Sequence, residues 1–175
     1  MSLEHTVKQI KKIRVDALLG KKKHFNAADR KEKVNNIVGA IIVILNIFTG
    51  SVFFYLIFEN DTDFAKYIGA FIAFTGALLV AVREYFNLCP QIDGHRTVAS
   101  SYLDLAKKCD RINSYILDGV LSENQIIEKI EELSLEIAEI NLAANSFPTN
   151  KSDYVKSLKG FQAGEELYTE EELNT

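Results

Sequence analysis

The chain has 175 residues, of which 47% are hydrophobic, and a formal net charge of −4. This length suits one domain, and the charge balance gives no reason to expect direct nucleic-acid binding. The two cysteines, Cys89 and Cys109, have neither metal-ligand spacing nor a disulfide-rich context, which suits a reducing compartment. The first residues lack a signal-peptide pattern, so any membrane insertion is expected to use internal segments.

Residues 1–33 are expected to form a basic amphipathic helix on the cytoplasmic side. Its apolar stripe consists of Leu3, Val7, Ile10 and Ala17. Such a helix lies on anionic lipid or packs on a partner. The sequence GKKKH at 20–24 then breaks the stripe and places Lys21, Lys22 and Lys23 before the first apolar run. We interpret these lysines as a solvated or headgroup-bound patch and as candidates for the membrane interface.

Residues 34–86 are expected to form a transmembrane hairpin, with spans at about 34–58 and 64–83. No Asp, Glu, Lys or Arg lies between Val34 and Phe58. At about 1.5 Å per residue, this run exceeds the roughly 30 Å hydrocarbon core. The second run contains Lys66, which is close enough to its end to snorkel. The alternative is the buried helical hairpin of a soluble protein, but the remaining segments are too few to wrap two such helices.

The distribution of basic residues predicts the orientation. Lysines and arginines precede the first span and follow the second, whereas the connection at 59–63 carries Glu59, Asp61 and Asp63. By the positive-inside rule, both termini are expected in the cytoplasm of a bacterium, with the spans in its inner membrane. Arg83 and Glu84 then lie at the inner interface, where the arginine can reach lipid phosphates or pair with a carboxylate.

Small and polar residues inside the spans suggest packing contacts. The small residues of the second span recur every four positions, as Gly69, Ala73, Ala77 and Ala81. This spacing lets two helix backbones approach closely, either within the hairpin or between protomers. Asn46, with Thr49 beyond it, is strongly polar near the bilayer centre and needs a hydrogen-bonding partner or water. It is either a contact between helices or part of a polar ring that lines a pore.

Residues 87–148 are expected to form cytoplasmic helices. Apolar residues spaced by four and three positions make two seams, the first including Val98, Leu105 and Ile112 and the second including Ile130, Leu133 and Ile137. Such seams occur in helical hairpins and in coiled coils, so they hold either one bundle or an oligomer. Ser122 and Gln125 predict a capping box at the start of the second helix. Residues 149–175 are expected to hold a short capped segment and then an acidic, mobile tail.

No catalytic, metal-binding or cofactor-binding pattern stands out. His5, His24 and His95 are scattered, and the sequence contains no HExxH, GxSxG or GxGxxG motif. His95 with Arg96 is expected to be a surface pair at a helix entry. We therefore expect a protein that is not an enzyme and that binds no cofactor.

In its order of elements the chain resembles the SLATT family of bacterial two-span proteins. The resemblance is carried by the basic lead KQIKKIRVDALLGKKKHFNAADRKEK, two spans with a short connection, the exit REYF and the helix opening HRTVASSYLDLAKKCDRI. It implies an all-α membrane effector that oligomerises and permeabilises the inner membrane in nucleotide-signalled antiphage defence. A cyclic nucleotide or a signalling partner protein would then be the trigger. The alternative is a membrane-anchored scaffold that conducts nothing.

Overall fold

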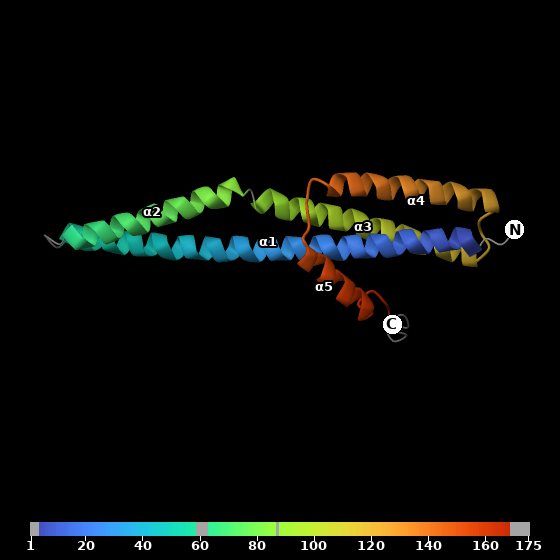
Figure 1. Cartoon of the computed structure of the whole chain (residues 1–175), viewed down its shortest axis with the longest axis horizontal. Coiled ribbons are helices and arrows are strands. Elements are labelled where there is room, and N and C mark those ends of the chain that lie inside the picture. The colour runs from blue at the N-terminus through green and yellow to red at the C-terminus, as the bar shows by residue number, and fades with distance from the viewer. Residues whose placement is uncertain (1–3, 59–62, 87, 169–175) are drawn as a thin grey trace. The chain divides into compact units, whose positions relative to one another are not determined.

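The computed structural model describes residues 4–58, 63–86 and 88–168, and all regular structure within these ranges is helical (Figure 1). The helices are α1 (Glu4–Phe58), α2 (Asp63–Tyr85), α3 (Leu88–Leu117), α4 (Glu123–Ala144) and α5 (Lys151–Gln162). The predicted all-α class is confirmed. Of the expected connection at 59–63, residues 59–62 lie outside the described residues and Asp63 begins α2. The apolar residue Leu3 also lies outside the described residues.

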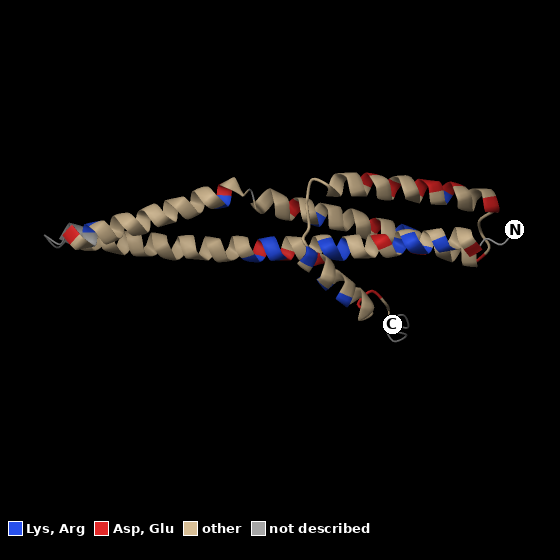
Figure 2. Ribbon diagram, in the orientation of Figure 1, with Lys and Arg blue, Asp and Glu red and all other residues tan. Residues whose placement is uncertain are grey.

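The chain divides into two compact units. The first, here called the bundle unit, comprises Met1–Ala28 and Asp93–Thr175, and the second, the hairpin unit, comprises Asp29–Ile92. α1 and α3 each contribute residues to both units. Charged residues are dense in the bundle unit, whereas α1 lacks them from Val34 to Phe58 and most of α2 lacks them (Figure 2).

α1 continues as one helix through the sequence GKKKH, where the apolar stripe was expected to break. Gly20 is buried inside this helix, and a Cβ placed on it would lie 2.9 Å from ring carbons of Tyr102 in α3. The glycine is therefore needed for close helix packing rather than for a turn. A single glycine has an unfavourable helix propensity, but this free-energy cost is outweighed by the helical residues on either side and by the packing of α3 against them.

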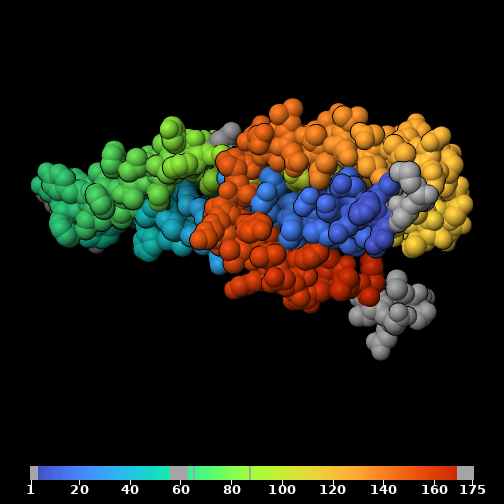
Figure 3. All heavy atoms as spheres, turned by 45° about the vertical axis from the view of Figure 1, so that its right-hand side comes forward, coloured from blue at the N-terminus to red at the C-terminus, as the bar shows by residue number. Residues whose placement is uncertain are grey.

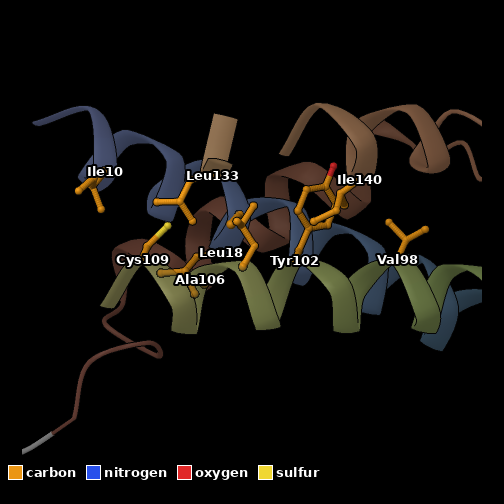
Figure 4. Packing of buried hydrophobic residues seen from close by; sticks show 10 residues of the cluster. Ile10, Leu18, Val98, Tyr102, Ala106, Cys109, Leu133 and Ile140 are labelled. Carbon is orange, nitrogen blue, oxygen red and sulfur yellow. The ribbon is translucent and has the colours of Figure 1, made fainter. Parts of the chain in front are cut away.

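The core of the bundle unit lies where α1, α3 and α4 meet (Figure 4). Buried residues come from α1 (Ile10, Ala17, Leu18), α3 (Val98, Tyr102, Leu105, Ala106, Cys109) and α4 (Leu133, Ile140), and the partly buried residues packed against them include Ile112, Ile130 and Ile137. The two predicted seams thus pack together within a single chain. Burial of Leu and Ile side chains at this spacing contributes about 1.5–3 kcal/mol each.

The ends of α4 and α5 follow local capping rules. The Ser122 backbone N–H donates to Gln125 Oε1 at 2.9 Å, as expected for the reciprocal bond of a capping box. Asn150 and Asp153 cap α5 in the same reciprocal way, with Asp153 N–H donating to Asn150 Oδ1 at 2.9 Å and Asn150 N–H to Asp153 Oδ2 at 3.0 Å. The segment expected as a short capped piece is therefore the three-turn helix α5, and Asp153, Ser157 and Gly160 are buried in it.

Candidate functional site

The apolar helices of the hairpin unit expose their side chains. In the most apolar 18-residue window of each candidate span, only 6% of the residues are buried within the chain. Phe53, Phe54, Phe71 and Phe74 are each more than 60% exposed. A core helix of a soluble protein would have these side chains covered by protein, whereas a helix in lipid exposes them to acyl chains. The geometry therefore supports the predicted transmembrane hairpin.

α1 and α2 meet along a seam with heptad-like spacing. The half-buried or buried residues of α1 in this seam are Asn35, Val38, Ile42, Leu45, Thr49 and Val52, and those of α2 are Gly69, Ile72, Gly76, Leu79 and Arg83. A Cβ placed on Gly69 would lie 2.9 Å from Val52 Cγ1, and one on Gly76 would lie 3.8 Å from Asn46 Oδ1. These glycines let the two backbones approach closely.

Ala73, Ala77 and Ala81 of the predicted small-residue stripe are exposed, whereas Gly69 is half-buried. Gly69 therefore faces the seam with α1, and Ala73 lines the cavity at the edge of that seam. The glycine that sits deepest in that seam, Gly76, was not among the predicted packing residues. The sequence signal for it was available, because steps of three and four from Gly69 through Ile72 to Gly76 define the seam face.

The polar residues of the first span occupy two different environments. Thr49 is half-buried, and its hydroxyl donates to Leu45 O at 2.9 Å, which satisfies it within the helix. Thr49 also lines a cavity of about 270 Å³ between the helices, with Val52 and Gly69. Asn46 is exposed, and among the described residues none hydrogen-bonds its side-chain amide.

Gly39 and Gly50 lie on the same face of α1 as Asn46, at steps of seven and four residues. A Cβ placed on either glycine would meet nothing within 4 Å. Sequence inspection singled out Asn46 but missed this face of small residues around it. Its pattern of Gly39, Val43, Asn46 and Gly50, spaced by four, three and four, would have revealed it.

Polar side chains hydrogen-bond one another at the end of the hairpin unit that carries Asn35 and Arg83. Arg83 Nε donates to Asn35 Oδ1 at 2.7 Å, so the arginine contacts an amide of α1. Lys31 also hydrogen-bonds Gln91, and Glu84 is exposed. An arginine with an amide partner can still present its remaining N–H groups to lipid phosphates, so the predicted interface role of Arg83 and Glu84 stays a prediction.

His24 of α1 and His95 of α3 form a buried pair in the bundle unit. Their Nδ1 atoms are 3.0 Å apart, and the side chains are 1% and 0% exposed. The expectation that His95 is a surface residue at a helix entry is therefore wrong. The reason is that His95 packs on Phe147, with ring centroids 5.8 Å apart, while His24 lies 5.9 Å from the ring of Tyr102. No local motif could reveal a contact between residues so distant in sequence.

Burial lowers the pKa of His24 from its ordinary 6.5 to about 4, and the nearby His95 and Lys23 add to this effect. Asp153 acts in the opposite direction. The Nδ1–Nδ1 contact needs one ring nitrogen to donate and the other to accept, and two imidazolium ions would have no acceptor. The pair is thus a buried structural contact between α1 and α3. Among the described residues, no group of three or more His, Cys, Asp and Glu side chains could hold a metal ion.

Of the three predicted interface lysines, two are engaged inside the bundle unit. Lys21 Nζ lies 2.7 Å from Glu166 Oε2, and Lys22 pairs with both Glu165 and Glu166. Lys23 lines a polar pocket of about 340 Å³ together with His24 and Tyr102. Whether these lysines also meet the membrane stays a prediction.

The fold and the exposed apolar hairpin define an all-helical membrane protein with two spans. A family model described as "SMODS and SLOG-associating 2TM effector domain family 4" (SLATT_4) matches residues 7–172. The chain therefore belongs to this family, as the resemblance implied, and it is a two-transmembrane effector domain of a kind associated with conflict systems. Neither the curated proteins nor the solved structures contain a match to the chain.

Proposed function

We propose that this protein is an effector that oligomerises in the bacterial inner membrane and permeabilises it when a defence system is triggered. Growth arrest or death of an infected cell would follow. The proposed trigger is a cyclic-nucleotide signal or a signalling partner protein. In this proposal both termini lie on the cytoplasmic side, and the protein acts without catalysis or a cofactor.

Asn46 is the observation that carries this proposal. Its amide lies mid-span, is exposed in the single chain and has no hydrogen-bonding partner among the described residues. Leaving such a group in hydrocarbon costs several kcal/mol, so a second chain or a column of water must satisfy it. A ring of Asn46 side chains from several protomers supplies both, because each amide can donate to its neighbour and accept from water.

The exposed small residues suggest where protomers meet. Ala77 and Ala81 lie outside the seam with α1, and Ala73 is exposed at its edge, so a second helix can approach them. Gly39 and Gly50 offer a similar approach on the face of α1 that carries Asn46. In lipid, close approach of this kind drives association through packing contacts.

A non-conducting scaffold is the second candidate, and the outer face of α4 favours it. Ile127, Leu135 and Leu142 are 54%, 67% and 72% exposed there, although the helix buries its other face in the core. An apolar face of this kind can bind a soluble partner. A scaffold of this type would need the spans only as an anchor.

Membrane potential distinguishes the two candidates. The full chain is expressed in bacteria together with its cognate signal, and a voltage-sensitive dye reports depolarisation. We expect the wild-type protein to depolarise the cells. A second assay measures the release of a trapped dye from vesicles that contain the reconstituted protein. There Asn46→Leu should reduce dye release at least tenfold, while membrane insertion and cross-linked oligomers are retained. Asn46→Gln, which keeps the amide, should retain leakage.

Asn36→Leu is the matched control, because it makes the same chemical change at an exposed position near the end of the span where water is available. It should leave leakage within about twofold of wild type. An intact membrane potential in cells that contain both the wild-type protein and its signal would refute permeabilisation and leave the scaffold. Unchanged leakage of Asn46→Leu would refute the pore assignment of this residue.

A further inference from the structure

Two neighbouring lysines of α1, Lys21 and Lys22, are covered by carboxylates from the end of the described chain. Lys21 Nζ lies 2.7 Å from Glu166 Oε2, and Lys22 Nζ lies 3.4 Å from Glu166 Oε1 and also pairs with Glu165. The side chains of Lys21, Lys22 and Glu166 are only 15%, 12% and 17% exposed. We call Lys21 and Lys22 the lysine pair and residues 163–168 the acidic strap.

The segment before the strap holds it against α1. Asn26 Nδ2 of α1 donates to the backbone carbonyl of Asp153 at 3.2 Å, which places the start of α5 on α1. After α5, Gly164 has a φ of +80°, a value that glycine adopts without strain, and the chain turns there. Gly160 leaves room for the Glu165 carboxylate, since a Cβ at this position would lie 2.4 Å from Glu165 Oε2. Figure 3 shows α5 and the strap lying against the first half of α1.

The contact is electrostatic in origin. Burial alone would lower the pKa of Lys22, but its hydrogen bonds to Glu165 and Glu166 and the charges of both groups outweigh burial and raise it. Lys22 in turn lowers the pKa of Glu165. Because burial of an ammonium group is unfavourable without a counter-ion, removal of the strap obliges the lysine pair to take water or another anion.

We propose that the acidic strap occupies an anion-binding surface formed by Lys21 and Lys22, and that anionic phospholipid headgroups compete with the strap for it. In the sequence, the first residue of the span, Val34, follows Lys22 by twelve residues. Arg30, Lys31 and Lys33 lie between and outnumber Asp29 and Glu32, so a net basic segment leads from the lysine pair to the span. The negative surface of an anionic leaflet attracts basic segments next to a span.

The acidic strap and the anionic membrane surface thus compete for the lysine pair. In a neutral bilayer it stays on the lysine pair, and in an anionic bilayer it is displaced. The proposal deepens the proposed function by supplying a regulatory contact, and it rests on the part of that function that places the hairpin in a bilayer. It does not depend on conduction, so its test reads the position of the strap and not leakage.

Hydrogen exchange of the full chain in vesicles tests the proposal. The protein is reconstituted in phosphatidylcholine vesicles and in vesicles with 30% phosphatidylglycerol, and exchange is followed by mass spectrometry over residues 161–168. Backbone bonds such as Glu165 N–H to Gly160 O report whether the strap is in place. We expect roughly tenfold faster exchange in the anionic vesicles.

Lys21→Gln with Lys22→Gln should speed exchange in both kinds of vesicle and abolish the difference between them. The matched control, Lys11→Gln with Lys12→Gln, removes the same charge from exposed positions of the same helix and should keep the wild-type response. Equal exchange of wild type in neutral and anionic vesicles would overturn the proposal, as would a persisting lipid response in the Lys21/Lys22 variant. If inorganic phosphate at matched ionic strength releases the strap equally well in neutral vesicles, the lipid assignment is wrong.

Discussion

The buried pair of His24 and His95 predicts a loss of stability in mild acid. In the folded chain the pKa of His24 is lowered from 6.5 to about 4, mainly by burial. Between these two values the unfolded chain binds more protons than the folded chain. Stability is therefore highest above pH 6.5, falls as the pH falls from about 6.5 to about 4, and changes no further below that for this group.

The size of this effect follows from the two pKa values. Moving from pH 7.5 to pH 5 should cost the bundle unit about 2 kcal/mol of unfolding free energy through His24 alone. The nearby charges do not reverse the sign, because Lys23 and His95 oppose protonation and Asp153 offsets only part of the burial effect. A change of this size corresponds to roughly a thirtyfold change in the population of open states.

Native-state hydrogen exchange of α3 around Tyr102 provides the assay, on the full chain in neutral vesicles. After correction for the pH dependence of intrinsic exchange, protection at pH 5 should be roughly thirtyfold lower than at pH 7.5. His24→Gln keeps a donor and an acceptor but cannot titrate, so its protection should vary much less with pH, even if it is lower overall. Protection of wild type that agrees within twofold at the two pH values would show that the pair does not resist protonation as argued.

Two further predictions concern packing. Gly94→Ala should destabilise the bundle unit by about 2 kcal/mol in thermal unfolding followed by circular dichroism, because a Cβ there would lie 1.9 Å from Phe147 Cε1. The same change at Gly39 of the hairpin unit, where a Cβ meets nothing within 4 Å in the same chain, should leave the unfolding of the bundle unit unchanged, and equal effects at both sites would contradict the close approach at Gly94. Burial raises the pKa of Cys109 to about 11, so N-ethylmaleimide at pH 7 should modify exposed Cys89 well before Cys109, as counted by intact mass. Equal rates would mean that the core opens readily.

Periodicity made the membrane spans and the core of the bundle predictable. The spans were predictable because Val34–Phe58 carries no charge and is longer than any charge-free run outside the spans. The core was predictable because residues such as Leu105 and Leu133 recur at steps that place them on one helix face. Both signals are local, since each depends on residues within a few turns. The helical class and the burial of the seams follow from them directly.

Contacts between distant residues left no such trace. Nothing near His24 in the sequence indicates that its Nδ1 atom lies 3.0 Å from that of His95. The basic cluster next to Gly20 was interpreted as a solvated patch that interrupts the apolar stripe of the helix. In the structure α1 continues through this cluster because Tyr102 fills the space beside Gly20. Lys21 is not solvated there, because Glu166 pairs with it. Tertiary contacts of this kind override local propensity, so a single sequence cannot disclose them.

If the hairpin assembles as proposed, the contacts between protomers must use faces other than the seam between α1 and α2. α2 uses Gly69 and Gly76 to approach α1, and this contact leaves Ala77 exposed on another face. Asn46 lies at the edge of the same contact with its amide open, so folding of one hairpin satisfies the apolar packing but leaves this polar group unsatisfied. The cost of an unsatisfied amide persists until another chain or water satisfies it, so this group would favour the proposed association. In the proposed assembly, hairpin formation and oligomerisation are separable steps, and we expect substitutions at Gly76 and Ala77 to affect them independently.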